Sequence, residues 1–189
     1  MLKMTKKWRT ISSEIVLNTP GVKVRKDKVD LMNGRVVDDF YVFEINEWST
    51  IVPLTEDGKL VLVEQYRHGV GDITLEFPAG LIDPGDGSPL ITAQRELTEE
   101  TGYSSDQWQS LGKYHLGPSK ILNSFHLFLA KNCKLTHAQN LDDTEDIRVL
   151  TVTLEEFERL FEQGKISDVD SSIGWLICQT KGLFNTDPQ

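Results

Sequence analysis

The chain has 189 residues, of which 39% are apolar and 26% charged, a composition typical of an ordinary globular protein with one well-buried core. Its 20 basic and 29 acidic residues give a net charge of −9, which argues against nucleic acid or an acidic membrane surface as a partner. No stretch approaches the ~20 apolar residues of a spanning helix, no apolar run follows the basic N-terminus, and Cys133 and Cys178 lack a disulfide or metal spacing. We therefore expect a cytoplasmic protein with reduced thiols.

The N-terminal part of the chain predicts a small antiparallel sheet. Its strand-like runs are Ile11–Leu17, Val22–Leu31 and Val36–Ile45, with the hairpin signal Asn33-Gly34 before the third. Three strands with one apolar face cannot bury it alone, so they must pack on the rest of the chain or on a second copy. We expect a subdomain over residues 1–47 and a main domain over residues 48–189.

The main domain shows strand and helix patterns in alternation. The expected strands are Ile51–Thr55, Leu60–Tyr66, Trp108–His115, Phe125–Ala130 and Ile147–Val152. A helix is expected from the cap at Ser88 to Gly102. Two more are expected at the end of the chain, one opened by a capping box at Thr153 and ended by Gly164, the other covering Ser171 to Leu183.

Three acids of the first helix, Glu96, Glu99 and Glu100, share one helical face because successive residues are rotated by about 100°. At about 6 Å and an effective dielectric near 20, two like charges repel by about 3 kcal/mol. Three acids without a basic partner on that face favour a hard cation such as Mg²⁺. The alternative is a solvated acidic surface.

The frame around these acids identifies a family. Residues 80–103, GLIDPGDGSPLITAQRELTEETGY, resemble the signature of the Nudix hydrolases, in which a helix between two loops holds Mg²⁺ for the cleavage of diphosphates linked to another moiety. Here Asp86 stands where the family has Glu, and Arg95 follows one residue late, which places an extra residue at Gly87. The resemblance implies an α/β/α sandwich with a mixed sheet, preceded by a small antiparallel sheet.

The resemblance also implies which residues hold the metal. The ligands would be the backbone carbonyl of Ala79 with Glu96 and Glu100, and Glu99 would be a close third carboxylate. Pro78 and Gly80 predict a sharp turn that leaves the Ala79 carbonyl without regular pairing. Arg95 is expected to pair with an acid of the cluster and orient it. Mg²⁺ is the expected ion, with Mn²⁺ as the alternative.

A second acidic segment, residues 136–146, reads by itself as a solvated loop. In the enzymes that hydrolyse ADP-ribose, a loop at this place carries an ExE arrangement that supplies a metal ligand and a base. The corresponding pair here is Asp143-x-Glu145. We expect Glu145 to serve in both roles, with Asp143 as the second candidate for the base and Glu99 as the third.

Several residues are candidates for contacts to substrate. Arg67 ends a segment similar to the QYR of the ADP-ribose group and could meet the diphosphate or a protein acid. Trp8 could stack on a nucleobase or close a dimer core. Leu81 is assigned to substrate as well.

The loop between the third and fourth expected main-domain strands carries further candidates for contacts to substrate. Pro118 fits the proline that marks ADP-ribose hydrolases, whereas Ser119 and Asn123 depart from the family's glycine and acid. Because Asn offers a donor and an acceptor, its contacts to base or ribose, and so the preferred sugar nucleotide, could differ.

The expected function is therefore metal-dependent hydrolysis of ADP-ribose or a related nucleoside diphosphate sugar to a nucleoside monophosphate and a sugar phosphate. Resemblance also implies a homodimer that exchanges its N-terminal sheets. The alternatives are a preference for GDP-mannose or another sugar nucleotide, and a non-catalytic nucleotide-sensing module. A sensing module normally carries a DNA-binding segment, and no basic helix-turn-helix pattern is present.

Overall fold

The computed structural model describes residues 5–184 and divides the chain into two compact units. The first unit comprises the chain up to Asn46 together with His115–Ser124, and the second comprises Glu47–Tyr114 and the chain from Phe125 onward. The segment His115–Ser124 lies within the stretch assigned from sequence to the main domain. It groups with the first unit because it pairs with a strand there. None of the helices within the described residues is long and apolar enough to cross a membrane.

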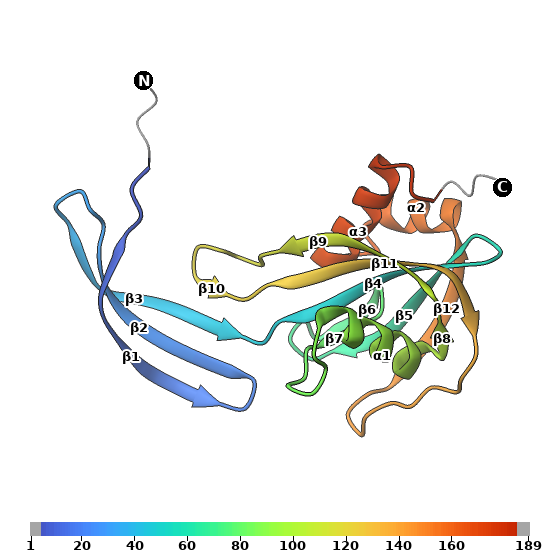
Figure 1. Cartoon of the computed structure of the whole chain (residues 1–189), viewed down its shortest axis with the longest axis horizontal. Coiled ribbons are helices and arrows are strands. Elements are labelled where there is room, and N and C mark those ends of the chain that lie inside the picture. The colour runs from blue at the N-terminus through green and yellow to red at the C-terminus, as the bar shows by residue number, and fades with distance from the viewer. Residues whose placement is uncertain (1–4, 185–189) are drawn as a thin grey trace. The chain divides into compact units, whose positions relative to one another are not determined.

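The first unit is a four-stranded sheet in the order β1-β2-β3-β10 (Figure 1). Its strands are β1 (Arg9–Thr19), β2 (Val22–Asp30), β3 (Val36–Ile45) and β10 (Ile121–Leu122). The three expected strands form the expected antiparallel ladders, and β10 adds a parallel partner to β3. A two-residue strand that pairs with residues nearly 80 positions away has no local pattern, which is why the sequence did not predict it.

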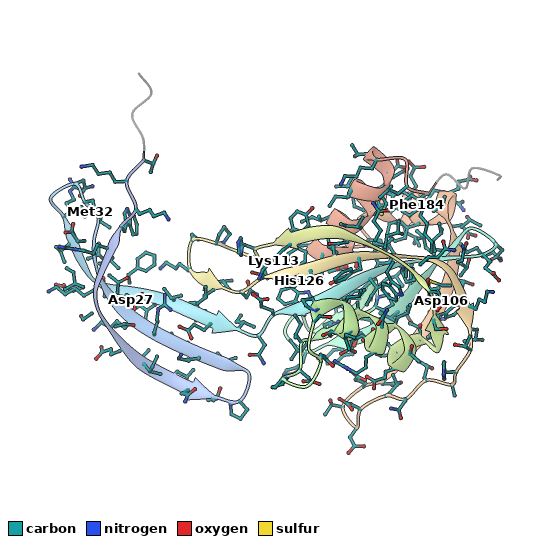
Figure 2. The ribbon with its side chains drawn as sticks, viewed as in Figure 1. Asp27, Met32, Asp106, Lys113, His126 and Phe184 are labelled. Atoms are coloured by element: carbon teal, nitrogen blue, oxygen red, sulfur yellow. The ribbon has the colours of Figure 1, made fainter. Side chains whose placement is uncertain are left out.

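Few side chains of this sheet are buried, and one of them is charged. Val24, Val29 and Val42 are buried, and so is Asp27, labelled in Figure 2, at 3% exposure. Asp27 accepts hydrogen bonds from Ser13 Oγ at 2.6 Å and from Arg25 Nε at 3.0 Å. A buried carboxylate is costly unless it is paired, so these bonds allow the sheet to keep a charge inside. Every residue of β1 is exposed.

The second unit holds a mixed sheet with the path β12-β5-β4-β11-β8, in which β11 is parallel to β4. The strands β6, β7 and β9 pair with β5, β4 and β11 respectively. The strands are β4 (Trp48–Thr55), β5 (Lys59–Arg67), β6 (Asp72–Glu76), β7 (Ala79–Leu81), β8 (Tyr103–Ser104), β9 (Gln107–Tyr114), β11 (Phe125–Leu135) and β12 (Ile147–Thr153). The helices are α1 (Pro89–Thr101), α2 (Leu154–Glu162) and α3 (Val169–Thr180).

Helices cover this sheet from both sides, which confirms the α/β/α sandwich (Figure 1). Side chains of a strand alternate between the two faces. On β4, Ile51 packs with Leu97 of α1, whereas its neighbour Val52 belongs to the cluster that includes Phe157 of α2 and Trp175 of α3. The acidic helix α1 therefore lies alone on one face of the sheet.

Capping residues determine where the helices begin and end. Thr153 and Glu156 form the expected capping box of α2, which ends at Glu162 with Gln163 as its cap. The last helix begins earlier than expected, because Asp168 caps it through a 2.8 Å bond from Ser171 N–H. It also ends at Thr180 and not at Leu183.

Candidate functional site

Helix α1 begins and ends where its caps require. Ser88 Oγ accepts the N–H of Ile91 at 3.3 Å, Pro89 opens the first turn, and Gly102 adopts a left-handed φ of 75° at the end. Glu96 and Glu100 then lie one turn apart and are 8% and 3% exposed. The acids of this helix therefore do not form a solvated surface.

A cavity of about 270 Å³ collects most of the predicted catalytic and metal-binding residues. It is lined by Arg67, Ala79, Gly80, Leu81, Asp83, Arg95, Glu96, Glu99, Glu100, Asn140, Asp142 and Glu145. Asp143 is exposed and does not line it. We call this space the acidic cavity.

Arg95 places a positive charge next to the acids of the acidic cavity. Its Nη1 lies 2.7 Å from Glu96 Oε1 and 2.9 Å from Glu99 Oε2. The pairing expected from sequence is confirmed, and the premise that the acids have no basic partner on their own face is wrong. Helical i,i+4 spacing brings Arg95 onto Glu99.

The other edge of the same guanidinium is held by Asp86. Arg95 donates to Asp86 Oδ1 at 3.2 Å and to Oδ2 at 3.0 Å, and Thr92 Oγ1 donates to Oδ2 at 2.8 Å. The guanidinium, and after it the Thr92 hydroxyl, hold the pKa of Asp86 well below its usual range. Asp86 thus fixes the orientation of Arg95, and through it that of two acids. Gly87, the position of the extra residue, has a φ of 65°.

The carboxylate of Glu96 lies directly against Gly80. A Cβ at position 80 would overlap the Cδ and both carboxylate oxygens of Glu96. Glycine at position 80 therefore leaves the Glu96 carboxylate room to lie in this place, and a larger residue would displace that carboxylate.

Ala79 lies in the short strand β7, paired with Thr50 of β4, and not in the sharp turn expected from sequence. Ile51 N–H donates to Pro78 O and Ile82 N–H to Glu47 O, so the hydrogen-bonded pairs of this ladder fall on either side of Ala79. The Ala79 N–H and C=O therefore point away from β4. The N–H donates to Glu100 Oε2 at 3.0 Å, which places the carbonyl oxygen on the side of the acidic cavity.

Burial shifts the proton affinity of the two enclosed acids. It raises the pKa of Glu96 to about 7, and it raises the pKa of Glu100 to about 8, where the nearby Glu96 charge adds to the effect. Burial therefore favours the protonated form of both carboxyl groups when no cation is bound. A cation bound between them would replace those protons.

The acidic loop of residues 136–146 is anchored to the end of α1. Gln139 Nε2 donates to Glu100 O at 2.7 Å, and Asn140 N–H donates to Glu99 O at 2.9 Å. These bonds bring Glu145 to the acidic cavity, where its Oε2 accepts the N–H of Asp142 at 3.0 Å. The loop therefore favours Glu145 over Asp143 by position. The anchoring role of Gln139 and Asn140 could not be predicted from the sequence, because both bind main-chain carbonyls, which every residue has.

Arg67 lines the acidic cavity and is paired at the same time. Its Nη2 lies 2.6 Å from Oε2 of Glu76, which is 7% exposed, and Thr74 Oγ1 donates to the same carboxylate at 2.5 Å. The sequence left open whether Arg67 pairs with a protein acid or with the diphosphate, and Glu76 is such an acid. The paired guanidinium is fixed in position beside Leu81, which also lines the cavity.

The remaining predicted substrate residues belong to the first unit. Trp8 is 53% exposed and meets Phe40 edge-on with ring centroids 5.6 Å apart. Ser119 is exposed, whereas Asn123 is 4% exposed and both polar atoms of its side chain lack a partner among the described residues. Their roles stay predictions.

The donor set fits a hard divalent cation in its chemistry. Carboxylates and a main-chain carbonyl are the ligands that Mg²⁺ prefers, and the acidic cavity presents Glu96, Glu100 and the side of β7 that carries the Ala79 carbonyl. Within residues 5–184 no three His, Cys, Asp or Glu side chains converge as a metal-binding group.

Family comparisons cover nearly the whole described chain. The NUDIX domain matches residues 47–169, and the nucleoside diphosphate sugar hydrolase N-terminal domain matches residues 8–43. The first match includes every residue that lines the acidic cavity, and the second includes β1, β2 and most of β3.

Individual relatives align with this chain over most of their lengths. The chain is 32% identical to a methanol dehydrogenase activator of Bacillus methanolicus, over 85% of this chain and 86% of the relative. It is 28% identical to an ADP-ribose pyrophosphatase of Bacillus subtilis, over 92% and 93%. It is 30% identical to a GDP-mannose pyrophosphatase of Yersinia enterocolitica, over 96% and 100%.

A solved structure shows the same fold. The crystal structure of an ADP compounds hydrolase superimposes with a TM-score of 0.82 over 96% of this chain and 98% of that chain, at 23% sequence identity.

Proposed function

This chain is a hydrolase that belongs to the NUDIX domain family, and we propose that it cleaves the diphosphate of ADP-ribose or a related nucleoside diphosphate sugar. The products are a nucleoside monophosphate and a sugar phosphate. The observation that carries the proposal is the acidic cavity, in which Glu96, Glu100 and Glu145 line one space with Arg67. The match of the N-terminal sheet to a nucleoside diphosphate sugar hydrolase domain supports the substrate class.

The proposed cofactor is Mg²⁺, with Mn²⁺ as the alternative. The Ala79 carbonyl, Glu96 and Glu100 would hold it, with Glu99 and Glu145 as further carboxylates. A bound cation of this kind offsets charge on phosphoryl oxygens and lowers the pKa of a bound water.

The chain's own residues have distinct tasks in this reaction. Glu145 takes a proton from the attacking water, whose oxygen forms a new P–O bond as the bridging P–O bond breaks. Arg67, fixed by Glu76, donates to the diphosphate oxygens. Arg95 keeps Glu99 and Glu96 in place. Glu99 and Asp143 remain the other candidates for the base, and Glu99 is the one of these two that lines the acidic cavity.

Product analysis tests the proposal. ADP-ribose, GDP-mannose and UDP-glucose are incubated with the protein with and without Mg²⁺, and the products are separated by chromatography. We expect AMP and ribose 5-phosphate to appear fastest, and only with metal. Faster release from GDP-mannose would establish the alternative favoured by the Yersinia relative. Tight binding of a sugar nucleotide without cleavage would establish the sensing alternative and reject catalysis.

We also propose a homodimer joined through the first unit. Apolar side chains of β1 are about half exposed, among them Ile11 at 48%, Ile15 at 50% and Leu17 at 47%. An edge strand with exposed apolar residues is a template for pairing. Light scattering should give twice the 21.4 kDa chain mass for the wild type and a lower mass for Ile15→Lys; a monomeric wild type would reject the dimer. The cytoplasmic location stays a prediction.

A further inference from the structure

A second cavity, of about 480 Å³, adjoins the acidic cavity in the same unit. It is lined by Trp48, Arg67, His68, Gly69, Val70, Glu76, Ala79, Gly80, Leu81, Asp168 and Asp170. Four of these residues, Arg67 and Ala79 to Leu81, also line the acidic cavity. The volume falls within the range of about 300–1,000 Å³ of small-molecule sites. A ligand whose diphosphate lies in the acidic cavity can therefore extend past Arg67 into this second space, which we call the side cavity.

One wall of the side cavity carries a fixed carboxylate. Asp170 Oδ2 accepts Trp48 Nε1–H at 2.9 Å and Thr50 Oγ1–H at 2.5 Å. Trp48 is held in turn by stacking on Phe125, with ring centroids 5.4 Å apart. Both donors occupy the same oxygen, so Asp170 is oriented by the sheet and keeps acceptor capacity at its other oxygen.

Asp168 stands beside it at the start of α3. Its Oδ2 caps the helix through Ser171 N–H at 2.8 Å, whereas its Oδ1 is buried without a hydrogen-bond partner among the described residues. An unpaired buried polar atom is costly and calls for a partner. Burial, and after it the Asp170 side chain, raise the pKa of Asp168 well above its usual range.

The side chains of Asp168 and Asp170 place carboxyl oxygens side by side in this cavity. A sugar hydroxyl can donate a hydrogen bond to such an oxygen. The diphosphate of a nucleoside diphosphate sugar has no such proton to donate, because each of its phosphates is substituted on both sides and ionised. The pair therefore selects a neutral group rich in hydroxyls and leaves the diphosphate to Arg67.

We propose that the side cavity binds the sugar half of the substrate, and that Asp168 and Asp170 contact its hydroxyl groups. The inference rests on the proposed function for the origin of the sugar, but the sugar site itself is testable by binding alone.

The discriminating variant is Asp168→Ser. Serine also caps helices well, so α3 keeps its N-terminal bond while the carboxyl group leaves the side cavity. Asp106→Ser is the matched control, because Asp106 is an exposed acid of the same unit and lines neither cavity (Figure 2). Circular dichroism of both variants checks that the fold is kept.

The readout is the dissociation constant of ribose 5-phosphate, measured by calorimetry against inorganic phosphate and AMP. For Asp168→Ser we expect about tenfold weaker binding of ribose 5-phosphate, the size of one lost hydrogen bond, and unchanged binding of inorganic phosphate. Asp106→Ser should match the wild type. Weakening of AMP alone would assign the cavity to the nucleoside and overturn the proposal. Equal affinity of the wild type for ribose 5-phosphate and inorganic phosphate would also overturn it, whether or not hydrolysis occurs.

Discussion

The contact between Gly80 and Glu96 makes a sharp prediction for Gly80→Ala. The new methyl group would overlap the Glu96 carboxylate. To restore a van der Waals separation of about 3.5 Å, that carboxylate must retreat by more than about 1 Å. Misplacement of a catalytic group by this distance costs about 10²-fold, equivalent to about 2.7 kcal/mol of barrier.

The assay is kcat/KM for ADP-ribose at saturating Mg²⁺, together with the thermal midpoint. The fold should persist, because the overlapped atoms are the far end of a side chain and the φ of Gly80 is not in the left-handed region. The matched control is Gly85→Ala in the loop that follows β7, since a Cβ at position 85 meets nothing within 4 Å. Wild-type kcat/KM in Gly80→Ala would refute the reasoning, and equal losses in both variants would point to the loop and away from Glu96.

Three further predictions concern single acids. Glu100→Gln removes a charge at nearly constant shape, so hydrolysis should fall by at least about 10²-fold with an unchanged circular dichroism spectrum; full turnover would reject the metal assignment. Glu145→Gln should lose more kcat than Asp143→Asn, because only the former lines the acidic cavity; the reverse order would make Asp143 the base. The lowered pKa of Asp86 means that its stabilising contribution is complete above its unfolded value near 3.8 and is lost as the pH falls below it. Asp86→Asn should therefore lower the thermal midpoint at pH 7 more than at pH 3, and an equal loss at both would contradict the ion pair with Arg95.

Local signals predicted the elements well. The cap at Ser88 and the left-handed Gly102 define α1, and the capping box at Thr153 defines the start of α2. Each of these caps depends on interactions between residues a few positions apart, so the local sequence is enough to predict where the helix begins or ends. The spacing of Glu96, Glu99 and Glu100 likewise predicted a shared face, and Glu96 and Glu100 do line one cavity with Glu99.

Long-range partners could not be read from the sequence. Trp48 and Thr50 meet Asp170 across more than a hundred residues, and no local pattern marks such a pair. Glu76 as the partner of Arg67 depends on the pairing of β5 with β6. The role of Asp86 was obscured by the extra residue in its loop, and only its bonds to Arg95 reveal it.

The placement of β10 has a consequence for protein engineering. The chain leaves the second unit after Tyr114, adds Ile121–Leu122 to the sheet of the first unit, and returns at Phe125. A truncation that begins at Glu47 would therefore keep β10 and delete β3, its only ladder partner among the described strands. The orphaned segment would expose the backbone groups of Lys120 and Ile121 that now pair with β3. A separately expressed second unit thus needs a redesigned connection from Tyr114 to Phe125.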